Sequence, residues 1–119
     1  MRRLCWCAIL PAALLFVTPA SAQAPSKVAV GRYECWANNR PRLLLNFSIK
    51  NATQYIGSDD AAGAYTYTLS TTRITFKGGA LDGVNPRGGY TIYHEPKGHP
   101  TVSFRNAEGS EISFCETVR

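Results

Sequence analysis

The chain has 119 residues, of which 45% are hydrophobic, and it carries a formal net charge of +5. This length is that of one domain and leaves little room for a second. The basic residues are scattered and accompany no recognition motif, so the charge does not indicate nucleic-acid binding.

The N-terminus has the pattern of a secretory signal peptide. Two arginines precede an apolar stretch over 4–17, and a small-residue cleavage site ends at Ala22. The stretch is shorter than a membrane span, and no second one follows it. We therefore predict a bacterial, Sec-type signal peptide over 1–22 and a periplasmic or secreted domain over 23–119. Removing two of the 13 basic residues leaves 11 against 8 acidic ones, a mature net charge of +3.

The four cysteines fall into two groups. Cys5 and Cys7 lie in the predicted signal peptide, whereas Cys35 and Cys115 lie near the two ends of the exported domain. A thiol pair in an oxidising compartment predicts one disulfide.

Hydrophobic residues alternate with polar ones along nearly the whole mature chain, which is typical of strands with one buried face. Turns rich in glycine, asparagine and aspartate separate these segments. The predicted strands cover 29–36, 42–50, 53–57, 64–70, 72–77, 79–84, 89–94, 101–105 and 110–116. Short sequential strands favour an all-β fold, a small antiparallel up-and-down barrel of about eight strands closed by the disulfide. An open sandwich is the alternative.

Alternation also predicts which side chains face inward. In the last strand it places Ile112 and Phe114 inside, which turns Cys115 outward. Cys35 shares the face of Tyr33 in the first strand. The bridge is therefore expected on the outer face or at a rim, unless one strand is bulged.

Most aromatic residues fall on the predicted inner face, where they would form the core. Trp36 and Tyr93 have the opposite parity. Trp36 precedes a loop with Arg40 and Arg42, and tryptophan and arginine are enriched at binding hot spots. We predict that these three residues bind a partner; the alternative is that Trp36 only shields the disulfide.

No pattern in the chain predicts catalysis or a cofactor. His94, Glu95 and His99 surround a turn, but a metal site needs a more complete ligand set, so we predict no metal. No nucleophile elbow surrounds a serine, and no glycine loop of the phosphate-binding type is present.

Several motifs resemble a group of small exported proteobacterial β-rich proteins for which no activity is established. They are Gly31-x-Tyr33-x-Cys35, Tyr55, Gly63-x-Tyr65-x-Tyr67, Ile74-x-Phe76-x-Gly78-Gly79-x-Leu81 and Cys115. The layout of signal, early Tyr-x-Cys and late cysteine is also similar to that of the periplasmic inhibitors of C-type lysozyme, which are small antiparallel barrels. Of their Trp-x-Lys-Gly strand only Lys77-Gly78 is matched here, and no serine loop precedes it.

The sequence thus predicts an exported, non-enzymatic binding or envelope-associated barrel. Its partner would be an unidentified envelope or extracellular protein, or a small ligand. The alternative function is inhibition of a cell-wall-degrading enzyme. A projecting loop with a basic or aromatic tip would favour the inhibitor, and a deep apolar cavity would favour a small-ligand carrier.

Overall fold

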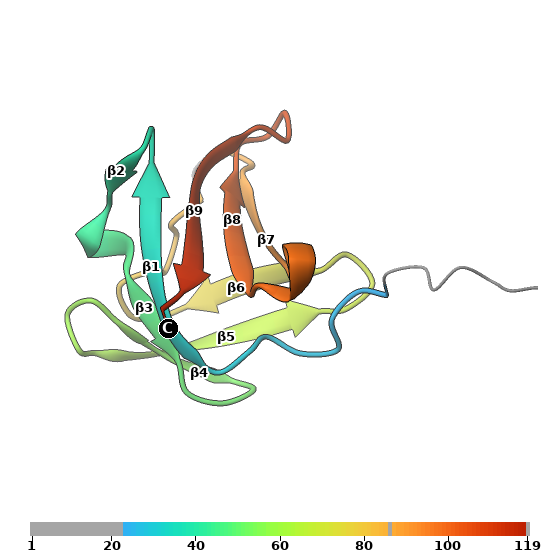
Figure 1. The fold of residues 1–119 in the computed structure, drawn as a ribbon. Coiled ribbons are helices and arrows are strands. Elements are labelled where there is room, and N and C mark those ends of the chain that lie inside the picture. Colours follow the sequence, from blue (N-terminus) through green and yellow to red (C-terminus); the bar gives the residue numbers. More distant parts are fainter. Residues whose placement is uncertain (1–22, 86, 119) are drawn as a thin grey trace, which may run out of the picture.

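The computed structural model describes residues 23–85 and 87–118, and within them it shows a closed antiparallel β-barrel (Figure 1). Each strand of the ring pairs with the next one along the chain, and β1 pairs with β9. The ring strands are β1 (Gly31–Ala37), β3 (Phe47–Ile49), β4 (Gln54–Gly57), β5 (Ala62–Thr68), β6 (Arg73–Lys77), β7 (Tyr90–His94), β8 (Thr101–Arg105) and β9 (Glu111–Thr117). The predicted fold class, an all-β barrel of about eight strands, is confirmed. The predicted signal peptide lies outside the described residues.

Three short elements lie outside the ring of strands. The two-residue strand β2 (Arg40–Pro41) extends the hairpin that follows β1, and η2 (Leu43–Leu45) and η3 (Pro96–Gly98) are single 3-10 turns. In Figure 1, β1, β9, β8 and β7 form one wall, and β5 and β6 cross behind it at a steep angle.

The predicted disulfide closes the ring. Cys35 of β1 lies directly opposite Cys115 of β9, and the two are bridged. Both side chains are buried in the core. β1 and β9 are the first and last strands of the ring, and their pairing forms the seam that leaves the sheet without exposed edges. The bridge therefore links the two strands of this seam covalently.

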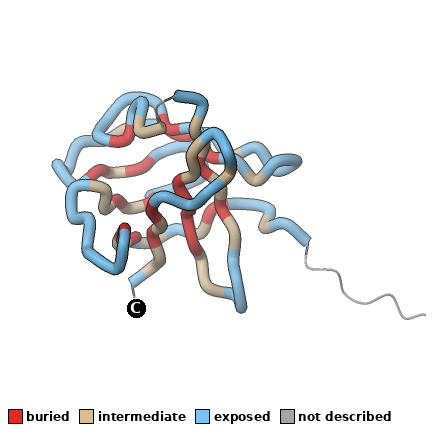
Figure 2. Tube along the Cα trace, turned by 90° about the horizontal axis from the view of Figure 1, so that it is seen from above, coloured by how far each residue is buried: buried red, intermediate tan, exposed pale blue. Residues whose placement is uncertain are grey.

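Aromatic rings fill the barrel. Phe76 lies at their centre: its ring centroid is 5.6 Å from that of Phe47, 5.0 Å from Tyr55 and 6.4 Å from Phe104. Figure 2 shows the buried residues within the strands of the ring and the longest exposed stretches in the loops that connect them. The rings interlock in edge-on and offset contacts, which pack more favourably than face-to-face sandwiches.

Tyrosine hydroxyls hold the N-terminal segment across one end of the barrel. Tyr67 donates to the carbonyl oxygen of Pro25, and Tyr33 donates to that of Ala29, each at 2.7 Å. The Ala29 amide in turn donates to the Tyr93 hydroxyl at 3.2 Å. The segment therefore closes the barrel end rather than hanging free of it.

These buried hydroxyls predict loss of stability at alkaline pH. Burial raises the pKa of Tyr33 and of Tyr93 well above the usual 10.0, and the neighbouring Tyr93 raises that of Tyr33 further. Below pH 10 both tyrosines keep their hydroxyl protons in the folded and in the unfolded protein. Above pH 10 they ionise only in the unfolded protein, so the free energy of unfolding falls as the pH rises. At about pH 11 the two tyrosines together should cost roughly 3 kcal/mol. Urea unfolding at about pH 9 and pH 11 tests this, and equal midpoints would contradict it.

Two predicted strands are wrong in part or entirely. Over 42–50 only β3 is a strand, because η2 turns the chain away from the wall and the Asn46 side chain accepts the hydrogen bond of the Cys35 amide at 2.8 Å. Over 79–84 the structure has turns, because Gly79 and Gly83 adopt positive φ values of 74° and 70°. Positive φ values are typical of glycine in turns, and they interrupt the hydrogen-bond ladder of a β-strand.

The predicted facing of the last strand is also wrong. Ser113 and Cys115 are buried, whereas Ile112 is half exposed and Phe114 is only partly covered. The bridge thus lies inside the barrel, not on its outer face or rim. Tyr93, predicted outside, is fully buried, because its hydroxyl finds polar partners at the barrel end.

Candidate functional site

The seam between β1 and β9 carries an apolar row on its outer face. Side chains alternate along a strand, so the inward Cys35 and Cys115 turn Trp36 and Phe114 outward. Trp36 lies opposite Phe114 on one side and opposite Pro41 of β2 on the other. The disulfide therefore fixes, from inside, the two strands that present this row.

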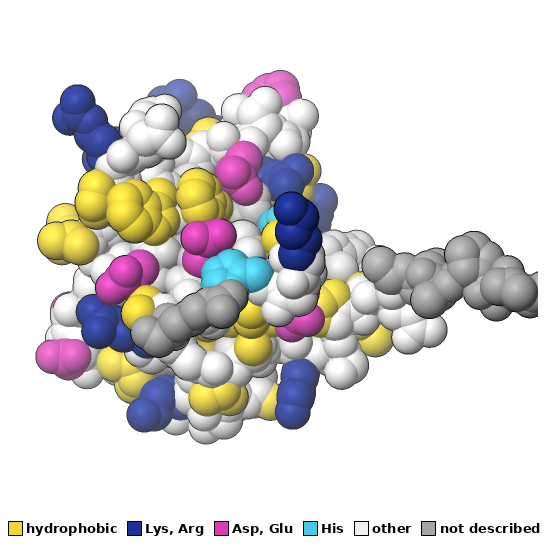
Figure 3. Space-filling view, in the orientation of Figure 1, with side chains coloured by type: hydrophobic (Ala, Val, Ile, Leu, Met, Phe, Trp, Pro, Cys, Tyr) yellow, Lys and Arg dark blue, Asp and Glu magenta, His cyan; other side chains and the backbone are white. Residues whose placement is uncertain are grey.

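Two leucines of η2 extend the apolar row. The side chains of Leu43 and Leu44 are 68% and 84% exposed, and the Leu44 carbonyl accepts a hydrogen bond from Ser58 at 3.0 Å. Figure 3 shows hydrophobic side chains running from the η2 corner across β1 to β9. We call this surface the apolar band; it consists of Trp36, Pro41, Leu43, Leu44, Ile112 and Phe114.

Charged residues lie near both ends of the apolar band. Arg40 and Arg42 are exposed at its β2 end, but Arg40 pairs with the buried Ala37 and so lies on the other face of the hairpin from Trp36. Glu34 and Glu116 lie next to each other across β1 and β9, on the other side of Trp36. Figure 3 accordingly shows basic side chains at the upper end of this face and acidic ones below the hydrophobic row.

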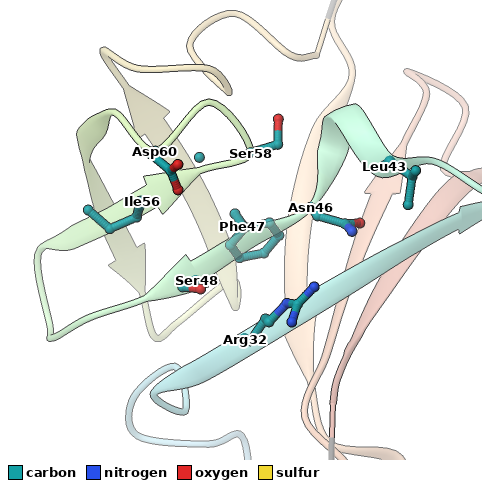
Figure 4. A pocket seen from close by; sticks show the side chains of 9 residues that line it. Arg32, Leu43, Asn46, Phe47, Ser48, Ile56, Ser58 and Asp60 are labelled. Carbon is teal, nitrogen blue, oxygen red and sulfur yellow. The ribbon is translucent and has the colours of Figure 1, made fainter.

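A shallow hollow adjoins the band beyond Leu43. It has a volume of about 470 Å³. Figure 4 shows Leu43, Asn46 and Arg32 on one side of it, with Ile56 and Asp60 on the other. Its lining mixes hydrogen-bonding and apolar groups, as does the rim of a protein interface.

The three residues predicted to bind a partner lie on one hairpin. Trp36 pairs with Pro41, which stands between Arg40 and Arg42 in the chain. Trp36 and the disulfide lie on opposite faces of β1, so Trp36 does not cover the bridge from within the barrel. The binding role itself stays a prediction.

Sequence reasoning missed the other members of the band. Leu43 was expected inside a strand, and Phe114 was expected in the core. One signal was available: the run of three leucines directly after Arg42 is unusual for a half-buried strand, because its middle member must face outward.

Two of the residues weighed as metal ligands contact other side chains. Glu95 accepts a hydrogen bond from the Tyr93 hydroxyl, and His99, which precedes β8, lies 3.8 Å from Glu116 of β9. Among residues 23–85 and 87–118, no three His, Cys, Asp or Glu side chains are grouped so that they could hold a metal ion.

Comparison with known proteins adds no relative. No protein-family model, curated protein or solved structure matches this chain. The resemblances to small exported proteobacterial proteins and to lysozyme inhibitors stay predictions. Within the described ranges, no helix has the length and apolar character needed to cross a membrane.

Proposed function

We propose that this chain is an exported, non-enzymatic protein that binds another protein of the cell envelope or extracellular space through the apolar band. The observation that carries the proposal is the exposure of Leu43 and Leu44 beside Trp36 on a wall fixed by the disulfide. Contiguous exposed apolar side chains favour association with a partner. The signal-like N-terminus and the disulfide both suit an oxidising compartment outside the cytoplasm.

A protein partner fits this surface better than a small ligand inside the barrel. The interior is filled by stacked rings such as Tyr33 and Phe47, whose centroids are 5.0 Å apart, so a ligand there would have to displace core side chains. The band, by contrast, presents Trp36 and two exposed leucines beside a rim of hydrogen-bonding groups, and tryptophan is enriched at binding hot spots.

The β1–β2 hairpin favours inhibition of a cell-wall-degrading enzyme as a second function. Asn38 and Asn39 adopt positive φ values of 52° and 64°, as in the tight turns of two-residue hairpins. The hairpin projects at one end of the barrel (Figure 1) and presents the exposed Arg40 directly after its turn. A basic tip suits an active-site cleft that contains catalytic carboxylates. Capture of a wall-degrading enzyme whose activity falls on binding would support this function.

Changing Leu43 and Leu44 together to Ser should abolish partner capture without unfolding the protein. Both side chains are largely exposed, so stability should change by no more than about 0.5 kcal/mol per site. Capture of a defined partner from envelope extract by the tagged mature domain should fall roughly tenfold or more, as for other hot spots.

The matched control for this experiment is Leu69→Ser, since Leu69 is 50% exposed at the turn after β5, outside the apolar band. It should capture the partner as the parent does. Equal capture by the double variant and the parent would show that the binding face lies elsewhere.

A further inference from the structure

The strands β6 and β7 diverge after a short paired stretch. Along β6, every residue from Arg73 to Lys77 is paired with β5, but the pairing with β7 includes Arg73 and Ile74 alone. Beyond Ile74 the two strands separate, and the chain that connects them runs through turns and bends. The second half of β6 therefore has a neighbouring strand on one side only.

The backbone groups of Phe76 face the opening between β6 and β7. Hydrogen bonds alternate from one side to the other along an antiparallel strand. The Thr72 carbonyl, just before β6, accepts a hydrogen bond from the Tyr93 amide of β7 at 2.8 Å. Ile74, two residues on, is paired with Thr91 of β7, and Phe76 is two residues further, so its N–H and C=O point to the same side. Among the described residues neither group has a hydrogen-bond partner there.

A hollow of about 280 Å³ lies at this opening, and Phe76, Leu81 and Asn85 are among the residues that line it. Leu81 is 1% exposed, and its amide donates to the Tyr55 hydroxyl at 2.8 Å, which fixes an apolar wall. The side-chain nitrogen of Asn85 donates to the Thr91 hydroxyl at 2.6 Å, whereas its buried side-chain oxygen accepts no hydrogen bond from a described residue. The hollow is thus bordered by hydrogen-bonding groups that the described chain leaves unpaired.

A cation lies beside the closed end of the opening. The guanidinium carbon of Arg73 is 4.3 Å from the centroid of the Tyr90 ring, and both residues line the hollow. Lys77 is exposed further along β6. Neither Arg73 nor Lys77 forms an ion pair within the described part of the chain. These charges favour an anionic group on a bound ligand.

We propose that this opening binds the C-terminal end of an extended peptide, which adds to β6 as a short antiparallel strand. The last peptide residue lies opposite Phe76: its N–H donates to the Phe76 carbonyl, and one carboxylate oxygen accepts from the Phe76 N–H. The other carboxylate oxygen binds the guanidinium of Arg73. The N–H of the preceding peptide residue points away from β6, where the Asn85 side-chain oxygen accepts it. Paired residues share a face, so the last side chain meets Leu81 and an apolar one is favoured.

NMR titration of the mature domain with acetyl-alanyl-alanyl-valine tests this site. The backbone amide signals of Phe76, Leu81 and Gly89 should shift, with a Kd of about 1 mM or lower. The same tripeptide with its carboxylate converted to an amide should bind roughly tenfold more weakly, because it loses the charged partner of Arg73. Arg73→Gln should bind the two peptides with equal affinity. Lys50→Gln, exposed directly after β3, is the matched control and should behave as the parent does.

The outcomes separate this proposal from the proposed function, which uses a different face. Unchanged spectra at about 5 mM tripeptide overturn the peptide site, as does equal binding of the acid and the amide by the parent. Changing Leu43 and Leu44 to Ser should leave tripeptide binding unchanged even where it abolishes partner capture. A tripeptide whose binding depends on those leucines and not on Arg73 would contradict the assignment to the opening between β6 and β7.

Discussion

Replacing Cys35 and Cys115 together with Ala is expected to lower the free energy of unfolding by about 4–5 kcal/mol. The bridge closes a loop with a sequence separation of 80, and the unfolded chain gains the entropy of that loop when the bridge is lost. The two side chains are also buried, so their truncation leaves a small void. Denaturant unfolding of the parent and the variant, analysed with a common slope, measures the difference.

The parent under reducing conditions provides the control for this prediction. It should approach the stability of the double variant, and reductant should not affect the variant itself. A loss of less than about 1 kcal/mol on removing the bridge would show that the β1–β9 pairing holds the seam by itself. Because Trp36 and Phe114 adjoin the bridged pair, partner capture should weaken before the whole domain unfolds.

Phe76→Ala is expected to destabilise the domain by about 3–5 kcal/mol, the usual cost of removing a buried aromatic ring. The Phe76 side chain is only 6% exposed and contacts the rings of Phe47, Tyr55 and Phe104. Its loss leaves a cavity inside the barrel. The neighbouring rings cannot fill this cavity without leaving their preferred rotamers.

The neighbouring Thr75→Ala is the matched control, because Thr75 is exposed on the outer face of β6. Its effect should stay within about 0.5 kcal/mol. Equal unfolding midpoints for the two variants would mean that Phe76 does not lie at the centre of the core. The Phe76 side chain faces the interior of the barrel. The Phe76→Ala variant should therefore lose partner capture only in proportion to the fraction of its molecules that is unfolded.

The fold was predictable because the alternation of hydrophobic residues and the position of the cysteine pair both indicate a closed barrel. Alternation in a segment such as Ile74–Phe76 fixes both the strand and its buried face, and the structure follows it. The cysteine pair links the first and last strands, so it indicates the closed ring over the open sandwich. Alternation fails where glycines with positive φ replace a strand by turns, as between Gly78 and Gly83.

The candidate site was only partly predictable. Trp36 could be placed outside because its parity is opposite to that of Tyr33, which the aromatic pattern assigns to the core. Phe114 could not, since hydrophobicity alone placed it inside, whereas the bridge requires Cys115 to be there. Leu43 is exposed in the turn before Asn46, whose side chain accepts a hydrogen bond from the Cys35 amide, a contact that no local sequence pattern encodes.

Hydroxyl-radical footprinting of the mature domain, alone and with its captured partner, tests the role of the apolar band most directly. Oxidation of Trp36, Leu43, Leu44 and Phe114 should fall together on binding, while that of the exposed Leu69 stays constant. Such joint protection is expected because an interface excludes water from the centre of its contact. Unchanged oxidation of the band, with protection at Leu69 or around His99, would contradict the proposed binding face.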